Sequence, residues 1–158
     1  MKKKTLPLIF SLAMMIALVG AGVLAPQTAY AQSGGGKGTL TASGDGLAGI
    51  RGNGDVIISG NGILWIRDSA GDAVINVSGS GTRKEGENGW IRYSGFDGQA
   101  TVSGSQITVA LSGYDINLEA TGTGKFVLRG NGSYSVEKDG IIVLDGVWTE
   151  EMQIFSIP

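Results

Sequence analysis

Regularly spaced glycines constrain the fold of this chain more than any other feature. Between residues 39 and 68, three Gly-x-Gly triplets recur every eight residues, at Gly44-Asp45-Gly46, Gly52-Asn53-Gly54 and Gly60-Asn61-Gly62. The even positions between the triplets are apolar, and such alternation predicts β-strands with one buried face. These inward positions are Leu40, Ala42, Ala48, Ile50, Val56, Ile58, Leu64 and Ile66.

The triplets are typical of three-residue hairpin loops. Glycine at the last loop position adopts the left-handed conformation without strain. An odd loop length also keeps the inward residues at even numbers on both sides of the turn. A hairpin centred on Asn53 places Arg51 opposite Asp55 and Ile50 opposite Val56, so that opposite charges and apolar side chains are in register.

The chain contains an internal repeat. Residues 40–68 align without a gap onto residues 118–146, and ten of these positions are identical. The sequence Arg-Gly-Asn-Gly occurs in both copies, at 51–54 and 129–132. Because the identities concentrate in turns and small inward positions, we expect the repeat to preserve a backbone path rather than a binding site.

Further short strands are predicted between and around the two copies, at residues 73–78, 90–94, 99–103, 106–111 and 115–120. The charged segment from Thr82 to Gly89 breaks the eight-residue rhythm and is predicted to be a projecting loop. The sequence therefore predicts an all-β domain, an antiparallel meander of short strands that forms a barrel or a sandwich. A parallel β-solenoid is the alternative, since regular spacing also stacks equivalent turns on one face.

The N-terminus has the three parts of a secretory signal peptide, predicted at residues 1–31. Three lysines precede an apolar run, and the small-residue site Ala29-Tyr30-Ala31 predicts cleavage after Ala31. A retained membrane anchor is the alternative. Residues 32–38 are predicted to be a Gly/Ser linker and residues 39–158 a single domain. We expect the mature chain to be exported to the extracellular space, the periplasm or the cell surface, and not to span the membrane.

The composition argues against most catalytic chemistry. The chain has no histidine and no cysteine, so the commonest bases, nucleophiles and soft metal ligands are missing. We therefore predict neither an enzyme nor a cofactor. The remaining catalytic option is a pair of carboxylates, as in glycosidases. Its candidates are Asp68, Asp72, Asp97, Glu119 and Glu150, whose spacing singles out no pair.

Charge and turn composition exclude two further ligand classes. Without the three N-terminal lysines, nine Lys and Arg residues stand against fourteen Asp and Glu, so nucleic acid is not an expected partner. A calcium site is suggested by the turn residues Asp45, Asn53, Asp55 and Asn61. The second copy replaces the two aspartates with Thr123 and Ser133, and turn chemistry accounts for the first copy. No metal site is predicted.

Aromatic residues at outward positions are the best candidates for a binding site. Trp65 lies at an odd, outward position, and Trp90 shares a face with Arg92 beside the charged segment. The predicted ligand-binding set is Trp65, Trp90, Arg92, Tyr93, Arg83 and Lys84. The alternative is that Ile57, Ile63 and Trp65 form a second buried surface.

The sequence thus predicts an exported, non-catalytic β-sheet module, structural or macromolecule-binding, at the bacterial cell envelope or surface. An envelope protein or a glycan is the expected partner. A carbohydrate-binding module and a glycosidase-like enzyme are the alternatives.

Overall fold

The computed structural model describes residues 37–158, so the predicted signal peptide, its cleavage site and most of the predicted linker lie outside the described residues. The elements in chain order are β1 (Gly38–Asp68), β2 (Val74–Glu85), the 3-10 turn η1 (Glu87–Gly89), β3 (Trp90–Lys138), β4 (Ile141–Val147) and β5 (Gln153–Ile157). The five strands belong to one sheet, and every pairing in it is antiparallel. The prediction of an all-β, antiparallel fold is confirmed.

The first three strands form one long hairpin, with β1 and β2 as one arm and β3 as the other. Its tip is η1, where the backbone N–H of Gly86 donates to the carbonyl of Trp90 at 2.7 Å. Next to the tip, Glu85 pairs with Ile91. At the far end Gly38 pairs with Lys138. Residues 38–138 are therefore a single two-stranded ribbon.

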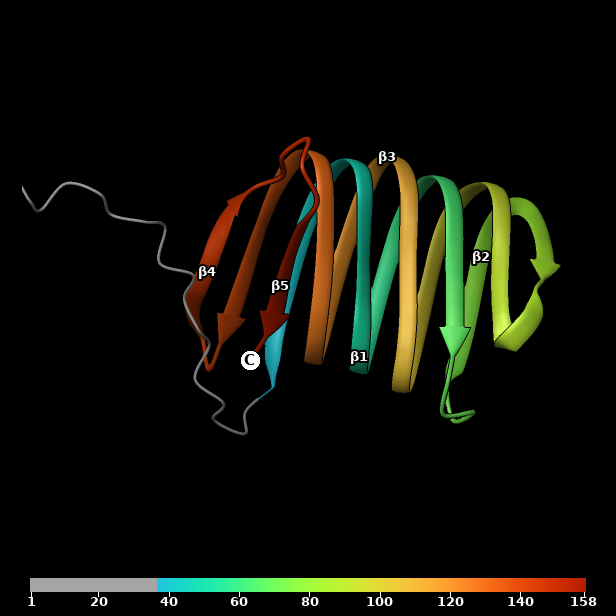
Figure 1. Cartoon of the computed structure of the whole chain (residues 1–158), viewed down its shortest axis with the longest axis horizontal. Helices are drawn as coiled ribbons and strands as arrows, with labels where there is room; N and C mark the ends of the chain where they lie inside the picture. Colours follow the sequence, from blue (N-terminus) through green and yellow to red (C-terminus); the bar gives the residue numbers. More distant parts are fainter. Residues whose placement is uncertain (1–36) are drawn as a thin grey trace, which may run out of the picture. The chain divides into compact units, whose positions relative to one another are not determined.

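This ribbon is wound into a coil, which Figure 1 shows from the side. Between its corners, each residue of β1 that faces the core pairs with two residues of β3, which lie one turn of the coil apart along the chain. Leu40, for example, faces both Ala120 and Val136, which are sixteen residues apart. The two arms consequently alternate along the coil, and the sheet is not closed into a barrel. Its free edges are β2 at one end and β4 and β5 at the other.

The Gly-x-Gly triplets are corners of this coil, and the prediction of hairpin loops is wrong. Arg51 pairs with Thr108 and Lys125 rather than with Asp55. The short strands expected between residues 90 and 120 are likewise successive stretches of the continuous strand β3. At each corner the chain bends and continues into the next stretch, where its partners come from distant parts of the sequence.

Close approach between corners explains why glycine is needed on both strands. Gly54 has φ of +136° and lies against Gly122 on the neighbouring strand. A Cβ atom on Gly54 would collide with the carbonyl oxygen of Thr121 and would lie 2.9 Å from the Cα atom of Gly122. The glycine spacing therefore reflects packing between turns of the coil as well as local conformation.

The stretches between corners form two walls that face each other across the hydrophobic core. The even positions of β1 are buried there, as predicted. In β3 the inward parity changes at Gly95, Gln106 and Asp115, which have positive φ angles of 64°, 48° and 54°. Among the described residues no polar or charged residue is fully buried. The largest buried side chains are Phe96, Phe126, Leu40, Ile58, Leu64, Ile66, Ile107, Leu111, Ile116, Leu118, Leu128 and Val102.

Aromatic residues close the β4 and β5 end of the core. The rings of Tyr134 and Phe126 lie 5.8 Å apart, and the ring of Phe155 lies 5.0 Å from that of Tyr134. Trp148 is buried, and its Nε1–H donates to the carbonyl of Ser133 at 3.1 Å. Burial raises the pKa of Tyr134. These side chains cover what would otherwise be the open end of the coil.

The two repeat copies pair with each other. Asp45 of the first copy faces Asn131 of the second, and Asn53 faces Thr123. A shift of 78 residues converts the first pair into the second with the strands exchanged. The repeat is thus a two-fold relation between antiparallel neighbours, which explains why its identities lie at the corners.

Half of the segment predicted to be a projecting loop, residues 82–89, is strand. Residues 82–85 belong to β2 and pair with β3, and the connection is confined to residues 86–89. The prediction of a loop that begins at Thr82 is wrong, because Arg83, Lys84 and Glu85 lie on β2 and point alternately to its two faces. Within residues 37–158, no helix has the length and apolar character needed to cross a membrane.

Candidate functional site

One wall of the coil gathers most of the basic side chains. We call its outer face the cationic wall; it consists of the outward residues of stretches 47–51, 63–67, 90–94, 108–112 and 125–129, together with those of 82–84 and 154–156. Six of the nine Lys and Arg residues between positions 37 and 158 lie on it: Arg51, Arg67, Lys84, Arg92, Lys125 and Arg129.

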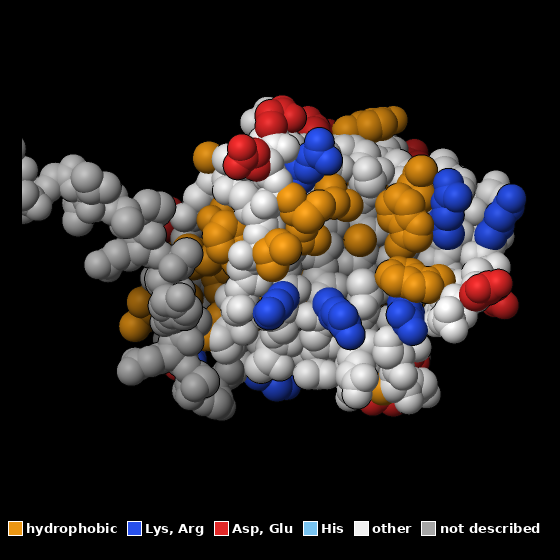
Figure 2. Space-filling view, in the orientation of Figure 1, with side chains coloured by type: hydrophobic (Ala, Val, Ile, Leu, Met, Phe, Trp, Pro, Cys, Tyr) orange, Lys and Arg blue, Asp and Glu red, His pale blue; other side chains and the backbone are white. Residues whose placement is uncertain are grey.

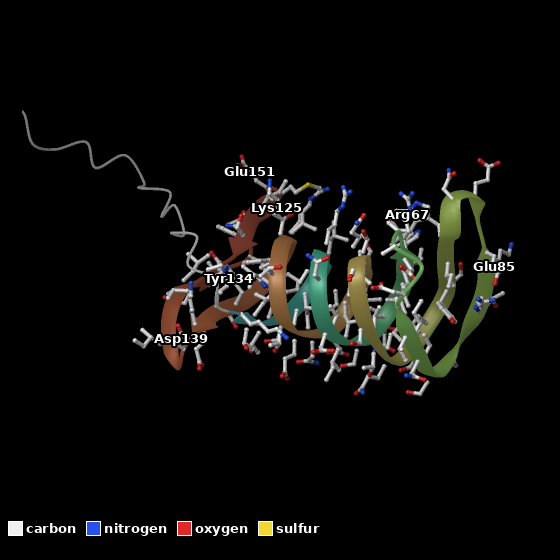
Figure 3. All side chains as sticks on the ribbon, turned by 90° about the horizontal axis from the view of Figure 1, so that it is seen from below. Arg67, Glu85, Lys125, Tyr134, Asp139 and Glu151 are labelled. Atoms are coloured by element: carbon white, nitrogen blue, oxygen red, sulfur yellow. The ribbon has the colours of Figure 1, made fainter. Side chains whose placement is uncertain are left out.

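The cationic wall carries no acidic residue at an outward position. Figure 2 shows this face, with Lys and Arg side chains among hydrophobic ones and Asp and Glu gathered at the rim. In Figure 3, Arg67 and Lys125 lie on the same side of the coil, whereas Glu85 and Asp139 lie near its two ends. The outer face of the opposite wall carries Asp55, Glu119, Glu137 and Asp145, and otherwise mostly Ser, Thr and Asn.

The six wall cations have no carboxylate partner among the described residues. Arg129 donates from Nε to the backbone carbonyl of Glu150 at 3.0 Å. Arg83 forms an ion pair with Glu85 at 2.7 Å, and neither residue belongs to the cationic wall. The positive charge of the wall is therefore not neutralised within residues 37–158.

Two pairs of these cations stand directly opposite each other on adjacent strands. Arg51 faces Lys125 across the β1–β3 ladder, and Lys84 faces Arg92 across the β2–β3 ladder. All four residues are exposed. Like charges directly opposite each other in a sheet are destabilising. The free protein consequently holds an arrangement that a bound anion would improve.

Two tryptophans are held among these cations by arginine. Trp65 faces Arg92, whose Cζ atom lies 5.9 Å from the centre of the indole ring. Trp90 faces Arg67 in the same way, at 5.6 Å. Both rings are half-buried, and cation–π attraction favours their position against the wall. The Nε atom of Arg67 is buried and has no hydrogen-bond partner in the described part of the chain.

A shallow groove of about 170 Å³ crosses the cationic wall. It passes over Gly49 and Ala110, whose small size leaves the space open; a Cβ atom on Gly49 would lie 2.9 Å from that of Ala110. Arg51 and Lys125 line one side, and Ile154 contributes an exposed apolar side chain. Trp65 follows Ala110 on the next strand, so the apolar strip of the groove continues onto an indole ring.

Four of the six residues predicted for the site come together on this wall: Trp65, Trp90, Arg92 and Lys84. Tyr93 and Arg83 lie on the other side of the same strands. Tyr93 packs inward with its ring 6.3 Å from that of Phe96. Hydrogen bonds to Glu85 and Tyr93 raise the pKa of Arg83, which is thereby engaged at the end of the coil.

The alternative interpretation, in which Ile57, Ile63 and Trp65 form a second buried surface, holds only in part. Ile63 and Trp65 are half-buried on the cationic wall, whereas Ile57 lies on the opposite wall and is 40% exposed. The sequence interpretation missed Arg51, Arg67, Lys125 and Arg129. One signal was present, because Arg51 and Arg67 are separated by sixteen residues, which is one turn of the coil and two of the eight-residue units.

Of the carboxylates considered for catalysis, Asp68 and Asp72 share the turn between β1 and β2, and Asp97, Glu119 and Glu150 lie elsewhere on the coil. Both carboxylate oxygens of Asp68 accept backbone N–H groups, from Ala70 at 3.1 Å, Gly71 at 2.7 Å and Ala73 at 2.9 Å. These bonds, led by that from Ala73, hold the pKa of Asp68 below its usual value of 3.8. Glu119 projects from the opposite wall.

The turn residues considered for calcium also have structural partners. The Oδ1 atom of Asp45 accepts the N–H of Asp115 at 2.8 Å, and that of Asn53 accepts the N–H of Gln106 at 2.8 Å. Asp55 accepts the hydroxyl of Ser103. Within residues 37–158, no cluster of three Asp or Glu side chains is arranged to hold a metal ion.

Comparisons with known proteins assign no family to this chain. It matches no protein-family model, no curated protein and no solved structure.

Proposed function

We propose that this chain is an exported, non-catalytic module that binds a glycan at the bacterial cell envelope or surface. The observation that carries the proposal is the groove over Gly49 and Ala110, which continues onto Trp65 and is bordered by hydrogen-bond donors. Shallow, partly apolar grooves with a few convergent polar groups suit ligands with both apolar and polar faces, as sugar rings have. The two walls act in this proposal as the layers of a sandwich, with one layer presented to the ligand.

The proposal is tested by measuring affinity for immobilised cell-wall glycans, neutral and acidic alike. The protein is the secreted chain, whose intact mass is expected to correspond to a start at Gln32. Trp65→Ala should weaken binding about tenfold or more, since buried aromatic contacts dominate such interfaces. Trp65→Phe should retain most of the affinity.

Tyr114→Ala is the matched control, because Tyr114 is an aromatic residue that is 59% exposed at a corner outside the cationic wall. Its removal should leave the affinity unchanged. Absence of binding to every glycan, or equal loss in the Trp65 and Tyr114 variants, would refute the proposed site. Melting temperatures of the variants separate lost binding from lost folding.

A structural role through an envelope protein is the second candidate function. Strand β4 is a free edge with exposed apolar residues, including Ile141 and Ile142, which are 67% and 61% exposed. Such an edge accepts a further strand from a partner. Loss of an envelope-protein contact in Ile142→Lys, with glycan binding absent, would favour this role.

A further inference from the structure

We propose that the glycan bound by the cationic wall is an acidic polysaccharide, whose carboxylate or sulfate groups pair with Arg51 and Lys125. This inference rests on the proposed function and specifies the chemistry of its ligand. The first ground is charge: six cations share one face without a carboxylate partner among the described residues, although the chain as a whole is acidic. The opposite wall carries acidic side chains, so the charge is segregated across the coil.

The second ground is the cross-strand arrangement of these cations. Arg51 and Lys125 face each other, as do Lys84 and Arg92, and each pair is unfavourable in the free protein. A single anionic group placed between two such cations turns the repulsion into two attractions. The geometry thus provides two anion positions on one face.

The third ground is the spacing of the charges along the coil. The cations follow one another across the sheet in the order Lys125, Arg51, Arg67, Arg92 and Lys84. The stretch 108–112 of β3, which carries no cation, lies between the stretches of Arg51 and Arg67. Five inter-strand steps of about 4.8 Å separate the first from the last, a span of about 24 Å. A small anion would occupy one pair of cations, whereas a linear polymer with repeated negative charges reaches them all.

The apolar strip distinguishes an acidic polysaccharide from a nucleic acid. Gly49, Ala110 and Trp65 provide a shallow surface beside the cations, which fits the apolar face of a sugar ring. Nucleic-acid binding instead relies on several aromatic faces on which successive bases stack, whereas this strip offers one indole ring, that of Trp65. The isoelectric point of about 5.0 also differs from the basic values of nucleic-acid-binding domains.

The test compares an acidic polysaccharide with the same polymer after its carboxyl groups have been reduced to alcohols. We expect the wild-type protein to bind the acidic form at least tenfold more tightly at low salt, and the difference to shrink as salt is added. Equal affinity for the two forms would overturn the inference and leave the glycan-binding proposal standing. Tighter binding to single-stranded DNA or to anionic lipid vesicles than to the acidic polysaccharide would also overturn it.

The variant Arg51→Gln/Lys125→Gln should bind the acidic polymer about tenfold more weakly and the reduced polymer as well as the wild type does. Lys37→Gln/Arg83→Gln is the matched control, because it removes two positive charges away from the cationic wall and should not change the affinity. Equal losses in the two double variants would show an effect of net charge alone and refute the site.

Stability of the unliganded protein gives an independent measurement. Because Arg51 and Lys125 repel each other across the ladder, their double replacement should maintain or raise the melting temperature while the affinity falls. A lowered melting temperature together with unchanged affinity would mean that the two cations serve the fold instead of a ligand.

Discussion

Single residues at the corners decide whether the coil can pack. Gly54 combines a positive φ with backbone atoms of the next turn at the position of its missing Cβ. We expect Gly54→Ala to lower the free energy of unfolding by about 1 to 2 kcal/mol or more, through conformational strain and displacement of the neighbouring strand.

Gly86→Ala is the control for this substitution. Gly86 has φ of −106°, and the nearest atoms to an added Cβ lie 3.6 Å away. Its replacement should change the free energy of unfolding by no more than about 0.5 kcal/mol. Urea titration of both variants checks the difference, and equal stabilities would contradict the close packing of corners.

Asp68 makes the stability depend on pH. Its pKa is lowered in the folded protein, chiefly by the N–H of Ala73, so the unfolded chain binds more protons as the pH falls. The stabilisation is complete above the usual pKa of 3.8 and is lost as the pH falls through the lower, folded-state value. We expect Asp68→Asn to be less stable than the wild type near neutral pH and to lose less stability on acidification.

Thermal melts between about pH 6 and pH 2 measure this dependence. Asp97→Asn serves as the comparison, because Asp97 is an exposed corner aspartate with no side-chain hydrogen bond among the described residues. Parallel pH profiles for wild type and Asp68→Asn would contradict the role assigned to the carboxylate.

At the scale of elements, side chains of β1 accept hydrogen bonds at two of the three positions where the inward parity of β3 changes. Gln106 and Asp115 have positive φ angles, and their N–H groups are accepted by Asn53 and Asp45 of the adjacent corners. These side chains therefore fix the points where the inward parity of β3 changes. Short polar residues at β1 corners serve the neighbouring strand as well as their own turn.

Removal of one such acceptor should be measurable. We expect Asn53→Ala to lower the free energy of unfolding by about 0.5 to 1.5 kcal/mol, the usual value of a hydrogen bond. Asn61→Ala is the matched control, since Asn61 occupies the next corner of β1 and its amide makes no hydrogen bond within residues 37–158. Guanidinium titration that finds the two variants equally destabilised would exclude the bulge-supporting role of Asn53.

At the scale of the whole molecule, the sequence predicts what is local and misses what is remote. Alternation of apolar residues reveals the buried face of β1 because it depends only on neighbours along the chain. A Gly-x-Gly triplet fits a hairpin and a corner equally well. The difference between them at Gly54 is set by Thr121 and Gly122, which lie almost seventy residues away.

The residues of the candidate site also differ in whether their proximity depends on local or remote parts of the chain. Trp90 and Arg92 were recognised because they are close in sequence and share a strand face. Lys125 and Arg51 are brought together by the winding of the coil, so their pairing is not visible before the turn length is known. Tyr93 and Arg83 pair with each other on the inward side of their strands, because they alternate with Arg92 and Lys84, which point outward.

The ribbon also determines which contacts are remote. Glu85 and Ile91 are six residues apart at the tip, whereas Gly38 and Lys138 are a hundred residues apart at the far end. The entropy cost of loop closure is smallest for the contacts at the tip, so these form first, and the predominance of remote pairs predicts slow refolding.

Gly89→Ala should slow refolding, since Gly89 has φ of +77° beside the tip. Phe155→Leu should mainly accelerate unfolding, because Phe155 lies at the other end of the coil. Stopped-flow measurements that find the reverse would contradict this order.

The winding has a consequence for the proposed export of a chain that is made from its N-terminus. Strand β1 emerges first, yet every partner that it has in the ribbon belongs to β3, which is synthesised later. No turn of the coil can close until the chain beyond the tip has followed. If the chain is exported as we propose, this strand order keeps the emerging chain unfolded until the part of β3 that pairs with β1 has followed it across the membrane.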